Sequence, residues 1–136
     1  MAFQHGKNAV FKLDNNGGSL QDLSTYIDSV DFAEPMDLAE TTTFGASVKT
    51  YIAGLKDADF SLSGKWDPTL DAHMAGIFGQ AATVTYEYGP EGGSGGDVKY
   101  TGEAVLTEYS ISSPVGDAVT WSATLKPAGA ITRTTY

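Results

Sequence analysis

Alternation of apolar and polar residues is the strongest constraint that this sequence places on its fold. In the segment ADFSLSGKW, residues 58–66, Phe60, Leu62 and Trp66 fall on one side of an extended chain and Asp59, Ser61 and Ser63 on the other. A period of two is typical of a half-buried β-strand. Residues 82–88 and 118–125 repeat it, with apolar positions at Ala82, Val84, Tyr86, Tyr88, Val119, Trp121, Ala123 and Leu125.

A longer segment, residues 98–111, keeps the alternation only in its first half. The phase slips at Val105 and Leu106, and Tyr109 and Ile111 continue on the opposite parity. The slip indicates either one strand bent by a β-bulge or two phases that meet at a corner of a sheet. Weaker alternation predicts further strands over 9–13, 29–33 and 130–135.

One segment has helical spacing instead. Asp67 is suited to the N-cap, Pro68 to the first helical position and Gly79 to the C-terminal stop. The apolar side chains between them follow i, i+4, i+7, i+8 spacing, at Leu70, Met74, Ile77 and Phe78. The sequence thus predicts a mainly β fold, a sandwich or barrel of six to eight antiparallel strands with one short flanking helix over about 68–78, in a single domain over 1–136.

The segment ETTTFGASVKTYIAGLKD, residues 40–57, follows neither period. It nevertheless carries five large apolar side chains, which a solvated loop has little reason to display, at Phe44, Val48, Tyr51, Ile52 and Leu55. We predict a long irregular loop here, with bends at Gly45 and Gly54.

Composition excludes several classes of function. The 136 residues contain no cysteine and have a net charge of −9, so thiolate chemistry is absent and phosphate backbones are repelled. There is no secretory signal and no apolar run near the roughly 20 residues that span a bilayer, so we expect no membrane contact. The only histidines, His5 and His73, are isolated, and no metal-ligand spacing surrounds them. We predict no catalytic, metal or cofactor site, and no enzyme.

The polar faces of the predicted strands are rich in hydroxyl groups. β-branched threonine favours the extended backbone while its oxygen faces water. These faces predict either an ordinary hydrated surface or a smooth wall to which other molecules adhere poorly. The residues are Ser61, Ser63, Thr83, Thr85, Thr101, Ser110, Thr120, Ser122 and Thr124.

Several segments together resemble the tail tube (major tail) proteins of long-tailed bacteriophages. The resemblance is carried by a Thr-rich approach to a long loop that ends in Tyr51, Ile52, Ala53, Gly54 and Leu55, and by the alternating strand and helix that follow. The opening MAFQHGKNAVFKLD and the closing AVTWSATLKPAGAITRTT are similar to that family too. The resemblance implies a siphovirus-type structural protein of the virion tail, made in the host cytoplasm, that forms hexameric rings stacked into a tube for DNA delivery.

The resemblance also implies partners and site residues. Other copies of the chain, a tape-measure protein in the lumen, tail terminator and tail-tip or baseplate proteins are expected, with DNA only in transit. The expected ring-stacking loop comprises Thr42, Thr43, Phe44, Val48, Tyr51, Ile52, Leu55 and Lys56, and the expected lumen-facing residues are Asp59, Ser61 and Ser63. The loop could instead fold back over its own sheet. The alternative functions are a tail terminator or connector protein, and a small carbohydrate-binding β-sandwich with Trp66, Trp121 and the tyrosines as a stacking platform.

Overall fold

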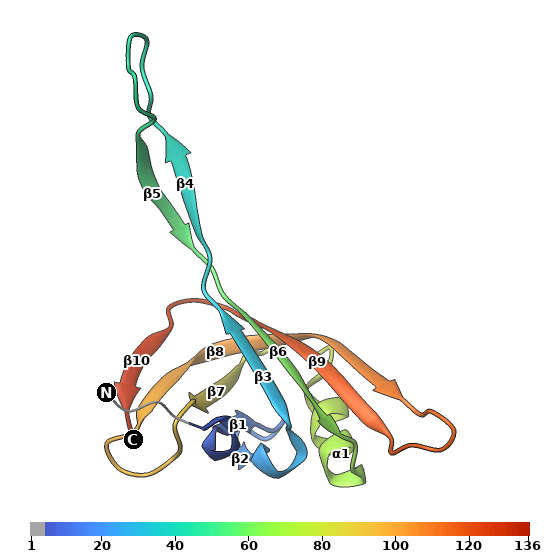
Figure 1. Cartoon of the computed structure of the whole chain (residues 1–136). Coiled ribbons are helices and arrows are strands. Elements are labelled where there is room, and N and C mark those ends of the chain that lie inside the picture. The colour runs from blue at the N-terminus through green and yellow to red at the C-terminus, as the bar shows by residue number, and fades with distance from the viewer. Residues whose placement is uncertain (1–4) are drawn as a thin grey trace.

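The computed structural model describes residues 5–136, and this part of the chain forms ten β-strands and one α-helix (Figure 1). Two short 3-10 helices span Gly6–Asn8 and Ser24–Tyr26, and α1 (Pro68–Ile77) lies between β6 and β7. The strands are β1 (Val10–Asp14), β2 (Leu20–Asp22), β3 (Ser29–Ala33), β4 (Met36–Glu40), β5 (Tyr51–Lys56), β6 (Asp59–Lys65), β7 (Val84–Gly89), β8 (Val98–Ser112), β9 (Thr120–Pro127) and β10 (Thr132–Thr135).

Eight of the strands form one antiparallel sheet, in the order β2-β1-β7-β8-β9-β6-β3 with β10 paired to the start of β8. The other two, β4 and β5, form a separate hairpin that projects away from the rest of the molecule (Figure 1). We refer to this hairpin and its turn, residues 36–56, as the arm. The remaining described residues, which include the eight-stranded sheet and α1, are the body.

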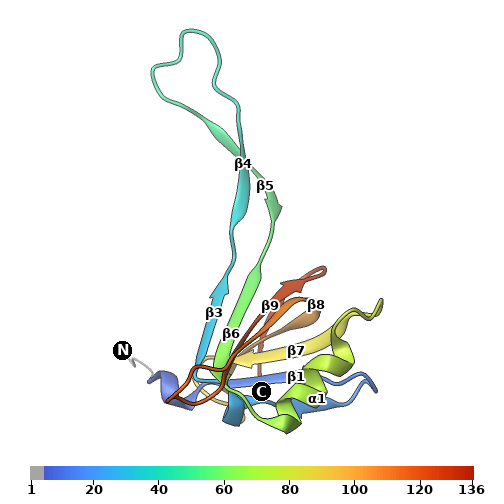
Figure 2. The ribbon, with the colours of Figure 1, turned by 90° about the vertical axis from the view of Figure 1, so that its right-hand side faces the viewer.

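The large sheet curls until its two ends face each other. The ring centroid of Phe60 on β6 lies 5.5 Å from that of Phe11 on β1 and 4.8 Å from that of Tyr86 on β7. Phe32 on β3 stacks on Phe60 at 4.4 Å and meets Tyr88 of β7 at 6.1 Å. Figure 2 shows β1 and β7 running across β3 and β6. The predicted β-sandwich or barrel is therefore confirmed, as one continuous sheet folded over its own core.

The alternating residues of the predicted strands make up most of this core. Phe60, Leu62, Tyr86, Trp121 and Leu125 are at most 2% exposed. Full burial of one such apolar side chain contributes about 1.5–3 kcal/mol, so these positions dominate the stability of the body. Further buried residues from other elements are Phe11, Leu13, Leu23, Leu70, Met74, Ile77, Val84, Ala104, Leu106 and Ala123.

A single bulged strand explains the phase slip after residue 98. β8 is continuous for 15 residues, and its register with β9 shifts between Leu106 and Glu108. Leu106 is buried before the shift, and Tyr109 faces the same core after it, with its ring centroid 6.4 Å from that of Trp121. Of the two alternatives, the bulge is correct, although it falls at Thr107 rather than at Val105 and Leu106.

The helix begins and ends close to its predicted bounds. Asp67 caps it, because the carboxylate Oδ1 accepts a hydrogen bond from the Thr69 N–H at 2.8 Å. Phe78 needs correction, since it is 53% exposed rather than part of the apolar face. Its backbone has already left the helix (φ −69°, ψ 126°), so its side chain turns away from Leu70 and Met74. Ala82 is likewise exposed, because β7 begins only at Val84.

The prediction of one irregular loop over 40–57 was wrong in its second half. Residues 51–56 form β5, which pairs with β4 over most of its length. The sequence shows no alternation there because neither face of the arm is buried in the chain, so a period of two is not required. Within the described residues, no helix has the length and apolar character needed to cross a membrane.

Candidate functional site

The arm concentrates the exposed apolar surface of the molecule. Of the eleven large apolar residues exposed in the described part of the chain, seven lie between residues 36 and 56. Clustered exposure of this kind marks an interaction surface, whereas apolar residues scattered singly over a surface are ordinary. The seven are Met36, Leu38, Phe44, Val48, Tyr51, Ile52 and Leu55.

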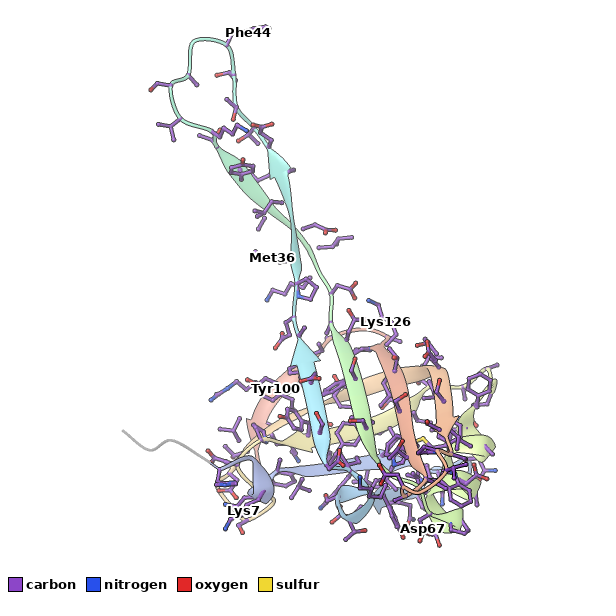
Figure 3. The ribbon with its side chains drawn as sticks, turned by 45° about the vertical axis from the view of Figure 1, so that its right-hand side comes forward. Lys7, Met36, Phe44, Asp67, Tyr100 and Lys126 are labelled. Atoms are coloured by element: carbon purple, nitrogen blue, oxygen red, sulfur yellow. The ribbon has the colours of Figure 1, made fainter. Side chains whose placement is uncertain are left out.

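Hydroxyl groups close the neck of the arm, where β4 and β5 meet the turn. The Thr41 N–H donates to the Thr50 carbonyl at 2.8 Å, and the hydroxyls of these two residues lie 2.9 Å apart. The Thr50 N–H donates to the Thr42 hydroxyl at 2.9 Å. Beyond the neck the turn bends at Gly45, whose φ of +85° lies in the region that favours glycine. The Thr-rich approach therefore holds the turn, and Phe44 stands at its end, fully exposed (Figure 3).

Both faces of the arm carry apolar side chains. Cross-strand partners project from the same face of a hairpin, so Leu38, which pairs with Ala53, shares its face with Tyr51, which pairs with Glu40. Ile52 pairs with Ala39 on the opposite face. A hairpin with one apolar face can lie on a surface, but one with two can be covered fully only from both sides.

The predicted loop residues all lie on the arm and are all exposed. Thr42, Thr43, Phe44 and Val48 belong to the turn, and Tyr51, Ile52, Leu55 and Lys56 belong to β5. Met36 and Leu38 on β4 were missed, although their alternation with Asp37 and Ala39 in MDLAE is a visible signal.

An ion-pair bridge holds the base of the arm. The Lys126 ammonium on β9 lies 2.6 Å from the Asp57 carboxylate and 3.1 Å from that of Asp59. The Asp57 N–H also donates to the Pro35 carbonyl at 2.9 Å, so the two connections between body and arm are bonded to each other. Hydrogen bonding to Lys126 lowers the pKa of Asp57 below its usual value, and hydrogen bonding to Asp57 raises the pKa of Lys126. Both charged forms are therefore favoured at neutral pH.

The predicted lumen residues lie together on the outward side of the sheet. Ser61 pairs with Asp31 on β3 and Thr124 on β9, and Ser63 pairs with Ser29 and Ser122. The same side of β8 continues this surface. We define the polar face as Ser29, Asp31, Asp59, Ser61, Ser63, Lys65, Glu108, Ser110, Ser112, Thr120, Ser122, Thr124 and Lys126.

Hydroxyl groups rather than charges dominate the polar face. Its three carboxylates are opposed by two ammonium groups, so the face is close to neutral, and the acidic surplus of the chain lies elsewhere. Neutral hydroxyls in water offer little net binding energy, because each contact replaces a hydrogen bond to solvent. The polar face is therefore a hydrated surface on which few groups can make strong contacts.

The remaining candidates have structural explanations. Trp121 is buried and donates from Nε1 to the Tyr26 carbonyl at 3.0 Å, and Trp66 packs against the core, so the two do not form a flat sugar platform. Burial lowers the pKa of His73 on α1, which lies beside Asp14. Between residues 5 and 136 the structure brings together no group of three potential metal-ligating side chains.

The fold defined by this body and arm is that of tube-forming tail proteins. It matches a chain from the tail of a gene transfer agent particle, refined with helical C6 symmetry, at 16% identity and a TM-score of 0.82, over 97% of this chain and 99% of that chain. It also matches the SPP1 tail tube (11% identity, TM-score 0.78, 98% and 80% covered). A third match is to the sheath–tube complex of an extracellular contractile injection system (12% identity, TM-score 0.71, 98% and 93% covered).

Family membership follows from the sequence. The family model of the phage tail tube protein matches residues 3–133, which is nearly the whole chain. The chain therefore belongs to the phage tail tube protein family. A search of curated proteins gives no match.

Proposed function

We propose that this chain is the repeating subunit of a tail tube, assembling as hexameric rings that stack through the arm into a channel for DNA. Family membership and the likeness to a tail chain refined with C6 symmetry support the ring. The observation that carries the proposal is the arm, whose apolar residues have no cover within the described chain. An isolated two-stranded hairpin is marginally stable in water, so the arm needs contacts from neighbouring copies.

The polar face fits the inner wall of such a channel. DNA in transit must not adhere, and a near-neutral surface of hydroxyls neither collects phosphates nor offers bases an apolar platform. Asp59, Ser61 and Ser63 would then line the lumen. During assembly the same wall would surround a tape-measure protein, and the tube ends would meet terminator and tip or baseplate proteins. The role is structural rather than catalytic, in the virion tail after assembly in the host cytoplasm, with residues 1–136 acting as one domain.

Removing the arm tests this proposal. Because the Asp57 N–H already bonds to the Pro35 carbonyl, residues 36–56 can be replaced by Asn-Gly, a two-residue turn suited to a hairpin. We expect wild-type protein to form rings or tubes in negative-stain micrographs, and the armless variant to keep its β circular dichroism spectrum while remaining monomeric.

A matched control separates the arm from general surface apolarity. Val115 is fully exposed in the β8–β9 turn, so Val115→Ser removes exposed apolar surface outside the arm and should leave tubes intact. Tubes formed by the armless variant would overturn the stacking role. Wild-type protein that forms single rings but never tubes would point instead to a terminator or connector.

A further inference from the structure

A groove at the opposite end of the body has the properties of a receptor for the arm. It has a volume of about 610 Å³ and lies between the start of β1 and the first residues of β3. Pockets of about 300–1,000 Å³ are typical of sites that enclose a bound group. Its apolar lining is Val10, Phe11, Ile27, Val30, Tyr88 and Pro90. We refer to it as the basal groove.

The arm of the same copy points away from this groove. Lys7, which lines the groove, lies at the lower end of the body in Figure 3, and Phe44 lies at the far tip of the arm. About ten extended residues separate Glu34 from Phe44, a reach of roughly 30 Å at about 3.3 Å per residue. The tip of the arm and the basal groove lie at opposite ends of one molecule, so they can meet only between two copies. Such a head-to-tail contact repeats along an axis.

The chemistry of the tip matches that of the groove. Phe44 and Val48 are exposed apolar side chains of the turn, and the apolar side chains that line the groove are half-buried except for Phe11, which is buried. The turn is flanked by one carboxylate and one ammonium, Glu40 and Lys49, and the groove carries one of each, Asp28 and Lys7. Opposite charges can therefore pair on both sides of the apolar contact, Glu40 with Lys7 and Lys49 with Asp28.

The edge of the sheet adds a polar component. β3 ends the strand order, so among residues 5–136 one of its edges has no strand partner. Residues 28–30, at the start of that strand, line the groove. Unpaired N–H and C=O groups at an edge form a template for an extended segment. Two further cavities offer less: one is lined largely by serine and threonine, and the other lies at the base of the arm itself.

We propose that the basal groove receives the tip of the arm from a second copy of this chain, with Phe44 as the buried anchor. This inference rests on the proposed stacking of rings and names the surface on which each arm docks. It assigns a role to Lys7, Asp28, Val10 and Val30, which the sequence did not single out.

Cysteine cross-linking between two variants tests the docking directly. The chain has no native cysteine, so each introduced thiol is unique. Phe44→Cys protein is mixed with Val10→Cys or, from the other side of the groove, Val30→Cys protein, under tube-forming conditions, and treated with a short bis-maleimide. We expect an arm-to-groove dimer with both groove variants, and little product when Thr107→Cys, exposed on β8, replaces them.

The outcomes distinguish this inference from the proposed function. Tubes without arm-to-groove product above the Thr107→Cys level would overturn the groove and leave stacking intact. Absence of tubes in wild-type protein would overturn the proposed function itself, on which the inference about the groove rests. Lys7→Glu should raise the concentration needed for tube formation roughly two- to fivefold, as expected for one exposed ion pair, and Glu40→Lys in the same chain should reverse the effect. Lys65→Glu on the polar face is the matched control, and equal effects of Lys7→Glu and Lys65→Glu would contradict the pairing.

Discussion

The body and the arm are built from the same local structure and differ in what covers them. The β3–β6 pair continues across Pro35 and Asp57 into the β4–β5 pair, so one long hairpin runs through both regions. In the body Phe60 and Leu62 of this hairpin are buried and Val30 and Phe32 are half-buried, whereas every residue of the arm is exposed. The body has the core of a stable domain, and the arm has the exposed apolar surface that we propose neighbouring copies cover.

The folding stability of the chain therefore resides in the buried core of the body, to which the arm contributes no residue. In the body, alternation places one side chain in two against the core, and burial dominates the energy. In the arm, apolar groups on both faces are exposed, so burial contributes nothing to their stability within the described chain. Substitutions in the buried core of the body should therefore change the free energy of unfolding, and substitutions in the arm, or in the groove proposed to receive it, should change association.

The largest effect on stability is expected when a phenylalanine of the core is compared with one at the tip of the arm. Phe60→Ala empties the centre of the core, where the side chain is 0% exposed, and should lower the free energy of unfolding by about 3–5 kcal/mol. Phe44→Ala removes the same atoms from the tip of the arm and should change it by less than about 0.5 kcal/mol. Urea unfolding followed by tryptophan fluorescence measures both. If Phe44→Ala abolishes tubes at unchanged stability, the arm acts in association and not in folding. A large loss of stability in Phe44→Ala would contradict this distinction between core and arm.

The next largest effect on stability is expected when a glycine of the body is compared with one of the arm. A Cβ at Gly64 would collide with the Tyr26 carbonyl oxygen, because the backbone of Tyr26 and Ile27 lies directly against β6 at this point. The backbone must shift, so Gly64→Ala should lower the free energy of unfolding by about 1–3 kcal/mol. A Cβ at Gly54 meets the Asp37 carbonyl at 2.9 Å, but both residues are exposed on the arm. Gly54→Ala should distort only the arm, and thermal melts of the two variants would reveal any equal effect.

The same contrast explains what could be predicted from the sequence. Strands of the body were recognised because burial of one face imposes a period of two, and α1 because Asp67, Pro68 and Gly79 bound it. The three-residue β2 was missed because it is short and exposed, β4 because its alternation is confined to five exposed residues, and β5 because no buried face dictates its pattern. Apolar content without periodicity was nevertheless a correct sign that residues 40–57 are unusual.

Features that depend on contacts between residues far apart in the sequence could not be predicted from it. Lys126 bonds to residues 69 and 67 positions earlier in the chain, and only the order β9-β6-β3 brings it to the base of the arm. The basal groove likewise joins residues 6–11 to residues 24–30 and to Tyr88. Single residues such as Lys7 carry no signal for such a site, because the site is defined by the curl of the sheet.

Titration of His73 should affect the body alone. Burial lowers its pKa from a usual value near 6.5, with the nearby Asp14 opposing the shift, so the folded protein binds this proton less readily than the unfolded chain. Its stabilising contribution is present above pH 6.5 and is lost as pH falls through the lowered pKa. The free energy of unfolding should decline across this range, and His73→Gln should flatten the decline. An unchanged slope in the variant would assign the titration to other groups.

The smallest effect on stability is expected from Lys126, where the arm joins the body. The substitution should instead change the direction of the arm relative to the body. Lys126→Met should leave the melting temperature unchanged, because exposed ion pairs contribute little, yet it frees the arm to pivot about Pro35 and Asp57. Spin labels at Ser47→Cys and Thr107→Cys report the distance between arm and body, and we expect its distribution to broaden. Lys126→Arg should restore the narrow distribution, and Lys65→Met should not alter it.

Acid should also break the bridge between Lys126 and Asp57, without any substitution. Since bonding to Lys126 holds the pKa of Asp57 below 3.8, the bridge persists as pH falls to that value and is lost only as pH falls through the lowered pKa. The raised pKa of Lys126 preserves it beyond pH 10.5 on the alkaline side. The arm-to-body distance in wild-type protein should therefore stay constant from about pH 4 to 10 and broaden in stronger acid toward that of Lys126→Met. A distribution that is already broad at neutral pH would mean that the arm is free before assembly, and that neighbouring copies alone fix its direction.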